Sequence, residues 1–348
     1  MGIFRLILFP FAVLYDGITR FRNFLYDRDI LKSVQFEANV VVIGNLAVGG
    51  TGKTPMVEYL IRQLKGQYKI AVLSRGYGRK TRGFRIADAG DTARTIGDEP
   101  LQMYQKFGKE CLVCVGAERE TSIPFILAEQ PDTRIILLDD AFQYRIVRPT
   151  LSIVLTRYSK LFFDDFLMPF GRLRECRTRI ANADIVVVTD CPGQLSGEAQ
   201  KKVKEEIGKY TSAPVFFTRL DYAEPVPLYK DHTIGKDIIV VTGVAHPEGL
   251  VRQVQSTRNL VSHVQFRDHH NFTRQDFVNI VNTYRKYDGK DVSILITEKD
   301  AVKWKDLQFL EILSGLPVFV QPVEHQFLSG SDEFLKLIVN SLSEYSHP

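Results

Sequence analysis

Short, continuously apolar runs alternate with amphipathic stretches along most of the chain. Before residue 190 these runs are NVVVIG, KIAVLS, CLVCVG, RIILLDD, LSIVLT and DIVVVT. Apolar runs of this length are typical of parallel strands covered on both faces of a sheet. Apolar residues at helical spacing separate them over residues 55–64, 100–107, 119–128 and 196–209. The pattern predicts an α/β fold with a doubly wound, mostly parallel sheet.

The pattern changes after Ser212, where a stretch rich in proline and aromatic residues shows no helical spacing. A second α/β series follows, with apolar runs DIIVVTG, VSHVQF, VSILIT and PVFVQP. The sequence therefore predicts an N-terminal helical segment at 1–35, a large α/β domain at 36–215, a connector at 216–236, a smaller α/β domain at 237–322, and a return connector with a closing helix at 323–348.

The N-terminal segment opens with an apolar run from Ile3 to Tyr15 that only Arg5 interrupts. As a helix these residues rise about 20 Å, which is too short for a hydrocarbon core of about 30 Å. Basic and aromatic residues alternate in the stretch that follows. This mixture favours a helix lying in a membrane interface. The alternative is a terminal helix packed on the protein's own core.

Composition places the chain among ordinary folded proteins. With 348 residues, 45% of them hydrophobic, it is long enough for two domains. Four cysteines are too few for a disulfide framework. Cys111 and Cys114 have CxxC spacing but lie in an apolar run, so we interpret them as structural. A net charge of +4 is a mild basic excess that could reflect an anionic partner, but the sequence contains no recognised nucleic-acid-binding module, so we expect no nucleic acid as partner.

The first apolar run leads into GNLAVGGTGKTP, a glycine-rich turn before a helix, as in a phosphate-binding P-loop. The backbone of such a turn faces phosphate oxygens, the lysine reaches the β- and γ-phosphates, and the following hydroxyl binds Mg²⁺. Ala47 stands where the usual pattern has glycine, at little cost if its φ is negative. The predicted nucleotide-binding residues of this turn are Gly49, Gly50, Thr51, Gly52, Lys53 and Thr54.

The run RIILLDD ends in two carboxylates, Asp139 and Asp140. Strand ends at this edge of a parallel sheet carry the metal-binding acid of P-loop proteins, so we predict that one or both bind Mg²⁺ together with Thr54. Thr297 and Glu298 stand where a guanine-reading motif would need asparagine, which disfavours GTP.

These motifs together resemble the tetraacyldisaccharide 4′-kinases, which phosphorylate the lipid A precursor disaccharide in bacteria with an outer membrane. The similar stretches occur in the family's order: GNLAVGGTGKTP, LSRGYGR, GDEP, LDDAFQ, GRLRE, FRDHHNF and TEKDAVK. Within this family's own P-loop Ala47 is no anomaly. One departure is Tyr144, where the family usually has histidine.

The resemblance implies a P-loop kinase domain, a smaller C-terminal α/β domain and a membrane-associated N-terminal helix. It implies that ATP and Mg²⁺ are used and that the acceptor is the 4′-hydroxyl of tetraacyldisaccharide 1-phosphate, so that lipid IVA is formed. The expected location is the cytoplasmic face of the bacterial inner membrane, with peripheral or monotopic attachment to its lipid surface. Nothing in the sequence indicates an obligate protein partner.

The resemblance also implies site residues beyond the P-loop. Asp98 in GDEP is the expected catalytic base, with His269 in DHH as its partner. We expect His269 to meet Asp98 across the domain interface, to orient its carboxylate and to raise its proton affinity at the moment of transfer. Arg174 is an expected catalytic phosphate contact and Arg119 an expected nucleotide contact. For Asp98 the structural alternative is a helix N-cap.

Two other classes of protein remain open from sequence alone. A P-loop NTPase acting as a switch or metallochaperone would hydrolyse its nucleotide without a lipid acceptor. A structural membrane-binding module would have no need of Lys53. The sequence leaves open the acyl-chain preference, the oligomeric state, and which of Asp139 and Asp140 binds the metal directly.

Overall fold

The computed structural model describes residues 3–229, 232–287, 291–305, 309–313 and 315–343, so the ends of the predicted N-terminal and C-terminal segments lie outside the described residues. The chain divides into two compact units. Unit 1 comprises Met1–Arg75, Glu110–Leu220 and His325–Pro348, and unit 2 comprises Gly76–Lys109 and Asp221–Glu324.

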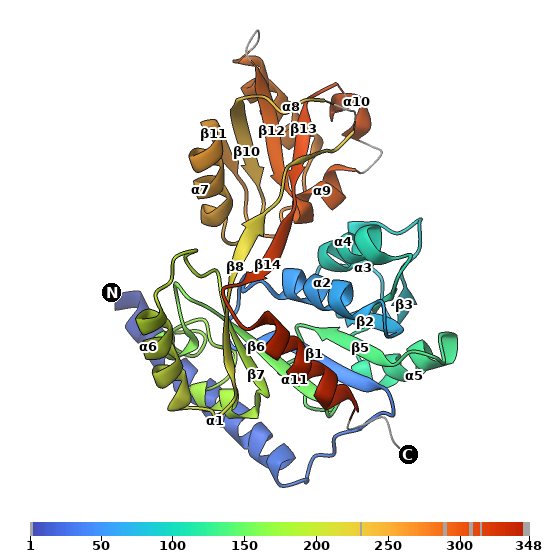
Figure 1. Ribbon diagram of the computed structural model, residues 1–348, viewed down its shortest axis with the longest axis vertical. Coiled ribbons are helices and arrows are strands. Elements are labelled where there is room, and N and C mark those ends of the chain that lie inside the picture. The colour runs from blue at the N-terminus through green and yellow to red at the C-terminus, as the bar shows by residue number, and fades with distance from the viewer. Residues whose placement is uncertain (1–2, 230–231, 288–290, 306–308, 314, 344–348) are drawn as a thin grey trace. The chain divides into compact units, whose positions relative to one another are not determined.

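Unit 1 is built on the large sheet (Figure 1). Its strands follow the order β14-β8-β7-β6-β1-β5-β2-β4, and those from β8 to β4 pair in parallel. Its elements are α1 (Ile3–Asp27), β1 (Asn39–Asn45), α2 (Lys53–Leu64), β2 (Ile70–Ser74), β4 (Leu112–Val115), α5 (Arg119–Glu129), β5 (Ile135–Asp139), β6 (Leu151–Arg157), η1 (Phe162–Asp164), η2 (Arg177–Asn182), β7 (Ile185–Thr189), α6 (Gly197–Gly208), β8 (Val215–Tyr222), β14 (Val323–Phe327) and α11 (Ser331–Ser343).

The burial of the central strands explains their composition. Every residue of β1, β2, β5 and β7 is buried, so both faces of the sheet are covered and polar alternation is absent. Helix α2 packs against β1 and β5, and α11 packs against β6. The predicted fold class is confirmed, and the carboxyl ends of these strands meet at one edge of the sheet, where ligands bind in such folds.

Unit 2 contains a smaller sheet of order β11-β10-β12-β13-β9, in which only the β13–β9 pair is antiparallel among the pairs described. Alternate residues of β10 and β12 enter two hydrophobic clusters, one around Phe277 and Trp304 and the other around Leu250 and Val254. The elements of unit 2 are β3 (Arg85–Ile86), α3 (Ala93–Ile96), α4 (Asp98–Phe107), β9 (Val226–Pro227), β10 (Asp237–Thr242), α7 (Glu248–Thr257), β11 (Asn259–Gln265), α8 (Arg274–Arg285), β12 (Val292–Thr297), α9 (Glu298–Trp304), α10 (Leu310–Leu313) and β13 (Val318–Gln321).

The two units divide the chain differently from the predicted boundaries, and two of the differences concern whole elements. Residues 76–109, assigned from sequence to the large domain, belong to unit 2, because α4 packs on α9 there. Residues 216–222, the first part of the predicted connector, belong to β8, a strand of the large sheet that pairs with β7. The hydrophobic pattern of an element does not reveal which unit the element packs with.

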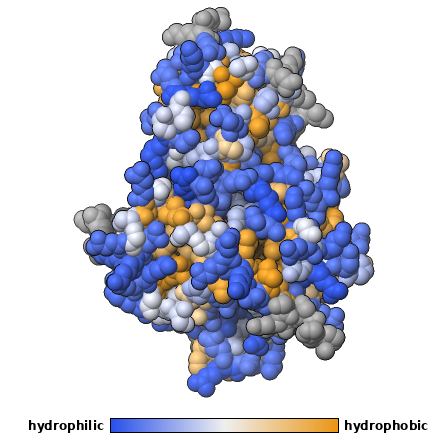
Figure 2. All heavy atoms as spheres, in the orientation of Figure 1, coloured by the Kyte–Doolittle hydropathy of each residue, from blue (hydrophilic) through white to orange (hydrophobic). Residues whose placement is uncertain are grey.

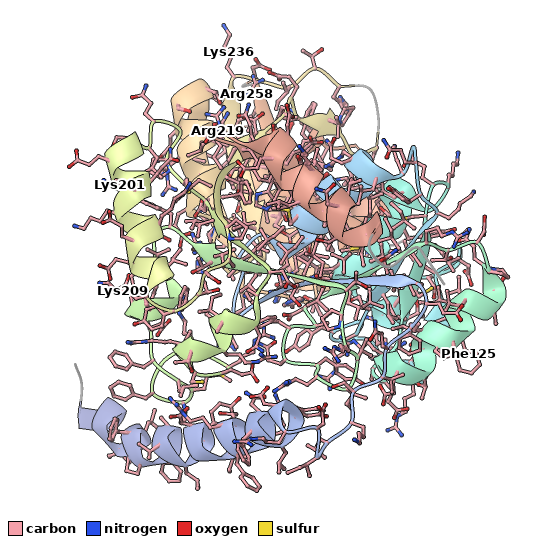
Figure 3. All side chains as sticks on the ribbon, turned by 60° about the horizontal axis from the view of Figure 1, so that its bottom comes forward. Phe125, Lys201, Lys209, Arg219, Lys236 and Arg258 are labelled. Carbon is pink, nitrogen blue, oxygen red and sulfur yellow. The ribbon has the colours of Figure 1, made fainter. Side chains whose placement is uncertain are left out.

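Helix α1 is longer than the predicted apolar run and exposes its apolar side. It spans 25 residues. Figure 3 shows it along one side of unit 1, with a row of side chains directed away from the sheet. Apolar residues that are 59–64% exposed recur at intervals of three and four: Ile7, Phe11, Leu14, Ile18 and Phe21. The buried residues of the opposite side are small or polar: Ala12, Thr19 and Asn23.

Polar contacts fix α1 to the rest of unit 1. Arg22 pairs with the buried carboxylate of Glu175 at 2.8 Å, and Asn23 donates to the same carboxylate at 3.2 Å. The hydroxyl of Tyr15 donates to the carbonyl of Arg174 at 2.8 Å. Within the described ranges, no helix combines the length and the hydrophobicity that crossing a membrane requires.

Candidate active site

The P-loop begins where the buried strand β1 ends at Asn45, and helix α2 begins at Lys53. Gly49 and Gly52 have φ angles of 108° and 82°, which residues with a Cβ rarely adopt. The turn therefore requires glycine at these two positions. It places Lys53 and Thr54 in the first turn of α2, where backbone N–H groups have no helical partner and can bind an anion.

Ala47 does not require the conformational freedom of glycine. It is absent from the described non-glycine residues with positive φ, and it forms an antiparallel bridge with Leu173. The neighbouring Val48 N–H donates to the carbonyl of Arg172 at 2.8 Å. The loop thus starts as a short extended stretch that pairs with the GRLRE segment, and alanine fits that conformation.

Two side chains hold the middle of the loop from the protein side. Asn45 donates from Nδ2 to the hydroxyl of Thr51 at 2.9 Å, and the Thr189 hydroxyl donates to the Thr51 carbonyl at 2.9 Å. Thr51 is buried, whereas Gly49 and Gly50 are exposed. The loop backbone is therefore fixed on one side and accessible on the other.

Two cations converge on Asp140. Lys53 Nζ lies 3.7 Å from Asp140 Oδ1, and the Arg174 guanidinium contacts both carboxylate oxygens, at 2.6 and 3.1 Å. Burial raises the pKa of Asp140, but Lys53 and Arg174 outweigh it and hold that pKa below its usual value. Arg174 also donates to the carbonyl of Asn45 at 3.1 Å, which joins this charge cluster to the start of the P-loop.

The predicted metal ligands are oxygen donors of the kind that Mg²⁺ prefers. Asp139 is the buried last residue of β5, and Asp140 follows it with a φ of 51°. Thr54 is the second residue of α2. One hydroxyl and one or two carboxylates at the end of a P-loop sheet fit a magnesium ion that takes its other ligands from phosphates and water.

Arg119 and Tyr144 form a cation–π pair at the start of α5. The Arg119 guanidinium lies 5.0 Å from the centre of the Tyr144 ring, and the Arg119 backbone N–H donates to the Tyr144 hydroxyl at 3.1 Å. The same hydroxyl contacts the carboxylate of Glu120. Burial and Glu120 raise the pKa of Tyr144 to about 12, so the phenol stays neutral. Tyr144 thus orients Arg119, a role that sequence reasoning did not assign to it.

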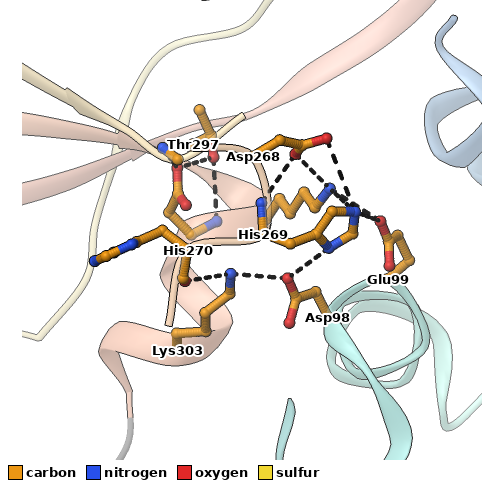
Figure 4. A network of polar contacts seen from close by, with 10 residues as sticks. Asp98, Glu99, Asp268, His269, His270, Thr297 and Lys303 are labelled. Carbon is orange, nitrogen blue, oxygen red and sulfur yellow. Dashed lines mark hydrogen bonds and ion pairs between the residues drawn. The ribbon is translucent and has the colours of Figure 1, made fainter. Parts of the chain in front are cut away.

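The second group of predicted residues lies within unit 2 (Figure 4). His269 Nδ1 is 3.2 Å from Asp98 Oδ2, although the two residues are 171 positions apart. Asp98 is the first residue of α4, and His269 has a φ of 56° in the loop after β11. Their meeting within one unit corrects the expectation that they face each other across a domain interface.

Two lysines of α9 surround this pair, and sequence reasoning missed both. Lys303 Nζ lies 2.8 Å from Asp98 Oδ2. Lys299 Nζ lies 3.0 Å from His269 Nε2 and 3.0 Å from Glu99 Oε1. Their spacing of four residues in TEKDAVK was the available signal, because it places both cations on one face of a helix.

The charge of these lysines also acts on Asp98. Burial raises the pKa of Asp98, but the hydrogen bond with His269 and the charges of Lys303 and Lys299 outweigh it, and the pKa lies below its usual value. In the resting site His269 therefore lowers the proton affinity of Asp98, and its expected effect at the moment of transfer stays a prediction. The N-cap alternative is wrong, since Gly97 is the N-cap residue of α4 and the cap has no side-chain hydrogen bond.

Comparison with known proteins gives consistent matches over nearly the whole chain. A sequence model of the tetraacyldisaccharide-1-P 4′-kinases matches residues 4–343. A tetraacyldisaccharide 4′-kinase of Flavobacterium johnsoniae is 42% identical over 333 residues, covering 94% of this chain and 95% of that protein. The tetraacyldisaccharide 4′-kinase of Parabacteroides distasonis is 37% identical over 353 residues, covering 97% and 95%.

A solved structure also matches. The crystal structure of LpxK from Aquifex aeolicus, described as an "apo" form in complex with ATP, superposes with a TM-score of 0.74. It is 26% identical in sequence, and the match covers 98% of this chain and 100% of that one.

Proposed function

This chain belongs to the tetraacyldisaccharide 4′-kinase family, and from that premise we propose how its own residues carry out the reaction. The reaction transfers the γ-phosphoryl group of ATP to the 4′-hydroxyl of tetraacyldisaccharide 1-phosphate. The P-loop of unit 1 binds the nucleotide, and the Asp98–His269 pair of unit 2 handles the proton of the acceptor.

Unit 1 supplies positive charge to the phosphates. Phosphoryl transfer spreads negative charge over the oxygens of the moving group, so fixed cations near those oxygens stabilise the transition state. Lys53 and Arg174 are held near one another by Asp140, and Arg119 is held by Tyr144. When bound, Mg²⁺ neutralises further phosphate charge, and Thr54 with Asp139 or Asp140 would hold it.

Asp98 accepts the proton of the 4′-hydroxyl. As that proton leaves, the hydroxyl oxygen bonds to the γ-phosphorus, the bond from this phosphorus to the bridging oxygen breaks, and ADP departs with the bridging oxygen. A loose transition state needs little prior activation of the nucleophile, so a carboxylate of low pKa is sufficient.

His269 orients this carboxylate through a defined tautomer. The ammonium of Lys299 has only hydrogens to offer, so His269 Nε2 accepts from it. The ring proton therefore lies on Nδ1, which donates to Asp98 Oδ2. His269 and Lys303 thereby hold Oδ2 of Asp98. The other carboxylate oxygen, Oδ1, accepts the proton of the acceptor hydroxyl.

One observation carries the proposal: in a chain of this family, the P-loop lysine Lys53 and Arg174 both contact Asp140, the acid at the end of a strand. The test is incubation with ATP labelled at the γ-phosphate and tetraacyldisaccharide 1-phosphate. We expect label in the lipid product. Release of label as inorganic phosphate, at the same rate with and without lipid, would instead favour a switch NTPase.

Removing the charge of Lys303 should shift the pH profile. The pKa of Asp98 is depressed partly by Lys303, so Lys303→Gln raises it and protonates the base at a higher pH. The acidic limb of kcat/KM should therefore move to higher pH, whereas Lys303→Arg, which keeps the charge, should leave it closer to wild type. Profiles of the three proteins that share one acidic limb would contradict the assignment of Asp98 as base.

Helix α1 supports a location on the membrane surface. Its exposed apolar stripe faces away from the rest of unit 1. Its opposite side makes the polar contacts that fix the helix to the rest of unit 1. A helix with this arrangement buries its apolar side in the headgroup region of a bilayer, where an acylated substrate also resides. We therefore propose a peripheral location at the cytoplasmic face of the inner membrane, where ATP is available.

The triple variant Phe11→Gln, Leu14→Gln, Ile18→Gln should reduce binding to vesicles of phosphatidylethanolamine and phosphatidylglycerol by about 10²-fold or more, since burial of one large apolar side chain contributes about 1.5–3 kcal/mol. Vesicle flotation measures this. The control is Phe125→Gln on α5, a phenylalanine that is 57% exposed and labelled in Figure 3. Apolar residues also reach the surface elsewhere (Figure 2), so equal losses in both variants would contradict a specific role of α1.

A further inference from the structure

A buried histidine of strand β14 contacts the P-loop backbone. His325 is 5% exposed, and its Nε2 lies 2.8 Å from the carbonyl oxygen of Gly52. Its Nδ1 lies 3.0 Å from the hydroxyl of Thr218 on β8. All three residues belong to unit 1. The region was predicted only as a return connector, and no role was expected for this side chain.

The partners determine which ring nitrogen carries the proton. A backbone carbonyl only accepts, so His325 Nε2 must donate to Gly52. Nδ1 then accepts from the Thr218 hydroxyl. Burial lowers the pKa of His325 to about 4, although Asp190 and the Gly52 carbonyl favour the charged form. The neutral ring therefore keeps this donor and acceptor arrangement at physiological pH.

The contact acts on the residue that precedes Lys53. A Cβ placed on Gly52 would lie 2.9 Å from His325 Nε2, so the ring packs directly against the loop backbone. The peptide unit is planar and trans, so the Gly52 carbonyl and the Lys53 N–H point in opposite directions. Holding the carbonyl at the ring therefore directs the Lys53 N–H away from it, at a residue whose left-handed φ of 82° glycine adopts without strain.

We propose that His325 is a positioning residue of the nucleotide site, which holds the Gly52–Lys53 peptide in the orientation that phosphate binding requires. The inference rests on the proposed function, because the proposed function assigns the P-loop to ATP binding. Asn45 and Thr189 hold the preceding residue, Thr51, so His325 completes a set of side-chain contacts to consecutive loop residues.

The test compares two replacements of similar size. His325→Gln retains an N–H donor, and His325→Met has none. We expect His325→Met to weaken ATP binding about fivefold, the usual worth of one such hydrogen bond, and His325→Gln to recover most of the loss. Isothermal titration gives the Kd for ATP, and steady-state kinetics should show a raised KM for ATP with the KM for lipid unchanged.

The controls separate positioning from general destabilisation. His263→Met disturbs a similar histidine–threonine contact in unit 2, where His263 Nε2 lies 2.9 Å from the Thr242 hydroxyl, and should leave the Kd for ATP unchanged. Thr218→Val keeps the bond to Gly52 and should change the Kd less than His325→Met does. If His325→Met fails to fold, the ATP titrations of His325→Gln and Thr218→Val still test the positioning role of His325.

Equal weakening by His325→Gln and His325→Met, or ATP binding unchanged in both, would overturn the inference, as would a Thr218→Val effect as large as that of His325→Met. If the wild-type protein binds ATP but transfers no phosphate to lipid, the proposed function fails. The same ATP titrations still test the positioning role of His325.

Discussion

Replacement of Lys53 by alanine is expected to lower phosphoryl transfer by about 10³-fold or more, since loss of a single preorganised donor to a developing negative charge costs about 10²–10³-fold and Lys53 also binds the ground-state phosphates. Lys53 is the first residue of α2 and pairs with Asp140 at 3.7 Å. Arg174 remains on Asp140 in the variant, so the carboxylate keeps a partner and the fold should persist.

The matched control for Lys53 is Lys65→Ala, at the other end of the same helix. Lys65 pairs with Glu110 at 2.8 Å near the surface, and such pairs contribute about 0–1 kcal/mol to stability. Label transfer from ATP to lipid should therefore be close to wild type for Lys65→Ala. Turnover near wild type for Lys53→Ala, in a protein whose circular dichroism is unchanged, would refute the assignment of the P-loop.

The second large effect is expected at Asp98 and His269. General-base assistance is worth about 10²–10⁴-fold, so Asp98→Asn and His269→Ala should each lower kcat by an amount in that range. Asparagine is preferred to alanine because the side chain of Lys303 is 7% exposed and contacts Asp98 at 2.8 Å. Removing the carboxylate side chain entirely would leave a buried cation without this partner, and the loss of stability would obscure the kinetics.

A double-mutant cycle on kcat, with both substrates saturating, decides whether the two residues act as one unit. His269 acts through Asp98 in our proposal, so the double variant should be little worse than Asp98→Asn alone. His270→Gln is the control, because its ring contacts Asp276 at 3.0 Å and makes no described contact with Asp98. Losses that simply add in free energy would mean that the two residues have separate roles.

The strands and the nucleotide site are the parts that sequence predicts well. Continuous apolar runs such as NVVVIG give buried parallel strands, and the glycines after β1 fix the turn that presents Lys53. Both signals are local. The P-loop needs left-handed backbone at Gly49 and Gly52, and glycine is the residue that adopts it without strain.

The remaining features depend on contacts between distant segments, which local patterns do not encode. The hydrophobic spacing of α4 is the same whether it packs in unit 1 or in unit 2. The effect of Lys303 on Asp98 depends on α9 lying against α4. Tyr144 is a departure from the family pattern in sequence, yet its ring supports Arg119. The resemblance suggested Asp98 and His269, but their shared unit and the direction of the pKa shift required coordinates.

The contact between His325 and Gly52 has a consequence for biosynthesis. The two residues are 273 positions apart, and His325 opens the last segment of unit 1. A chain emerging from the ribosome therefore carries the glycine-rich loop long before the histidine that holds it exists. We expect premature termination before β14 to yield fragments that contain the whole P-loop motif yet bind ATP weakly. ATP should therefore not protect these fragments from proteolysis.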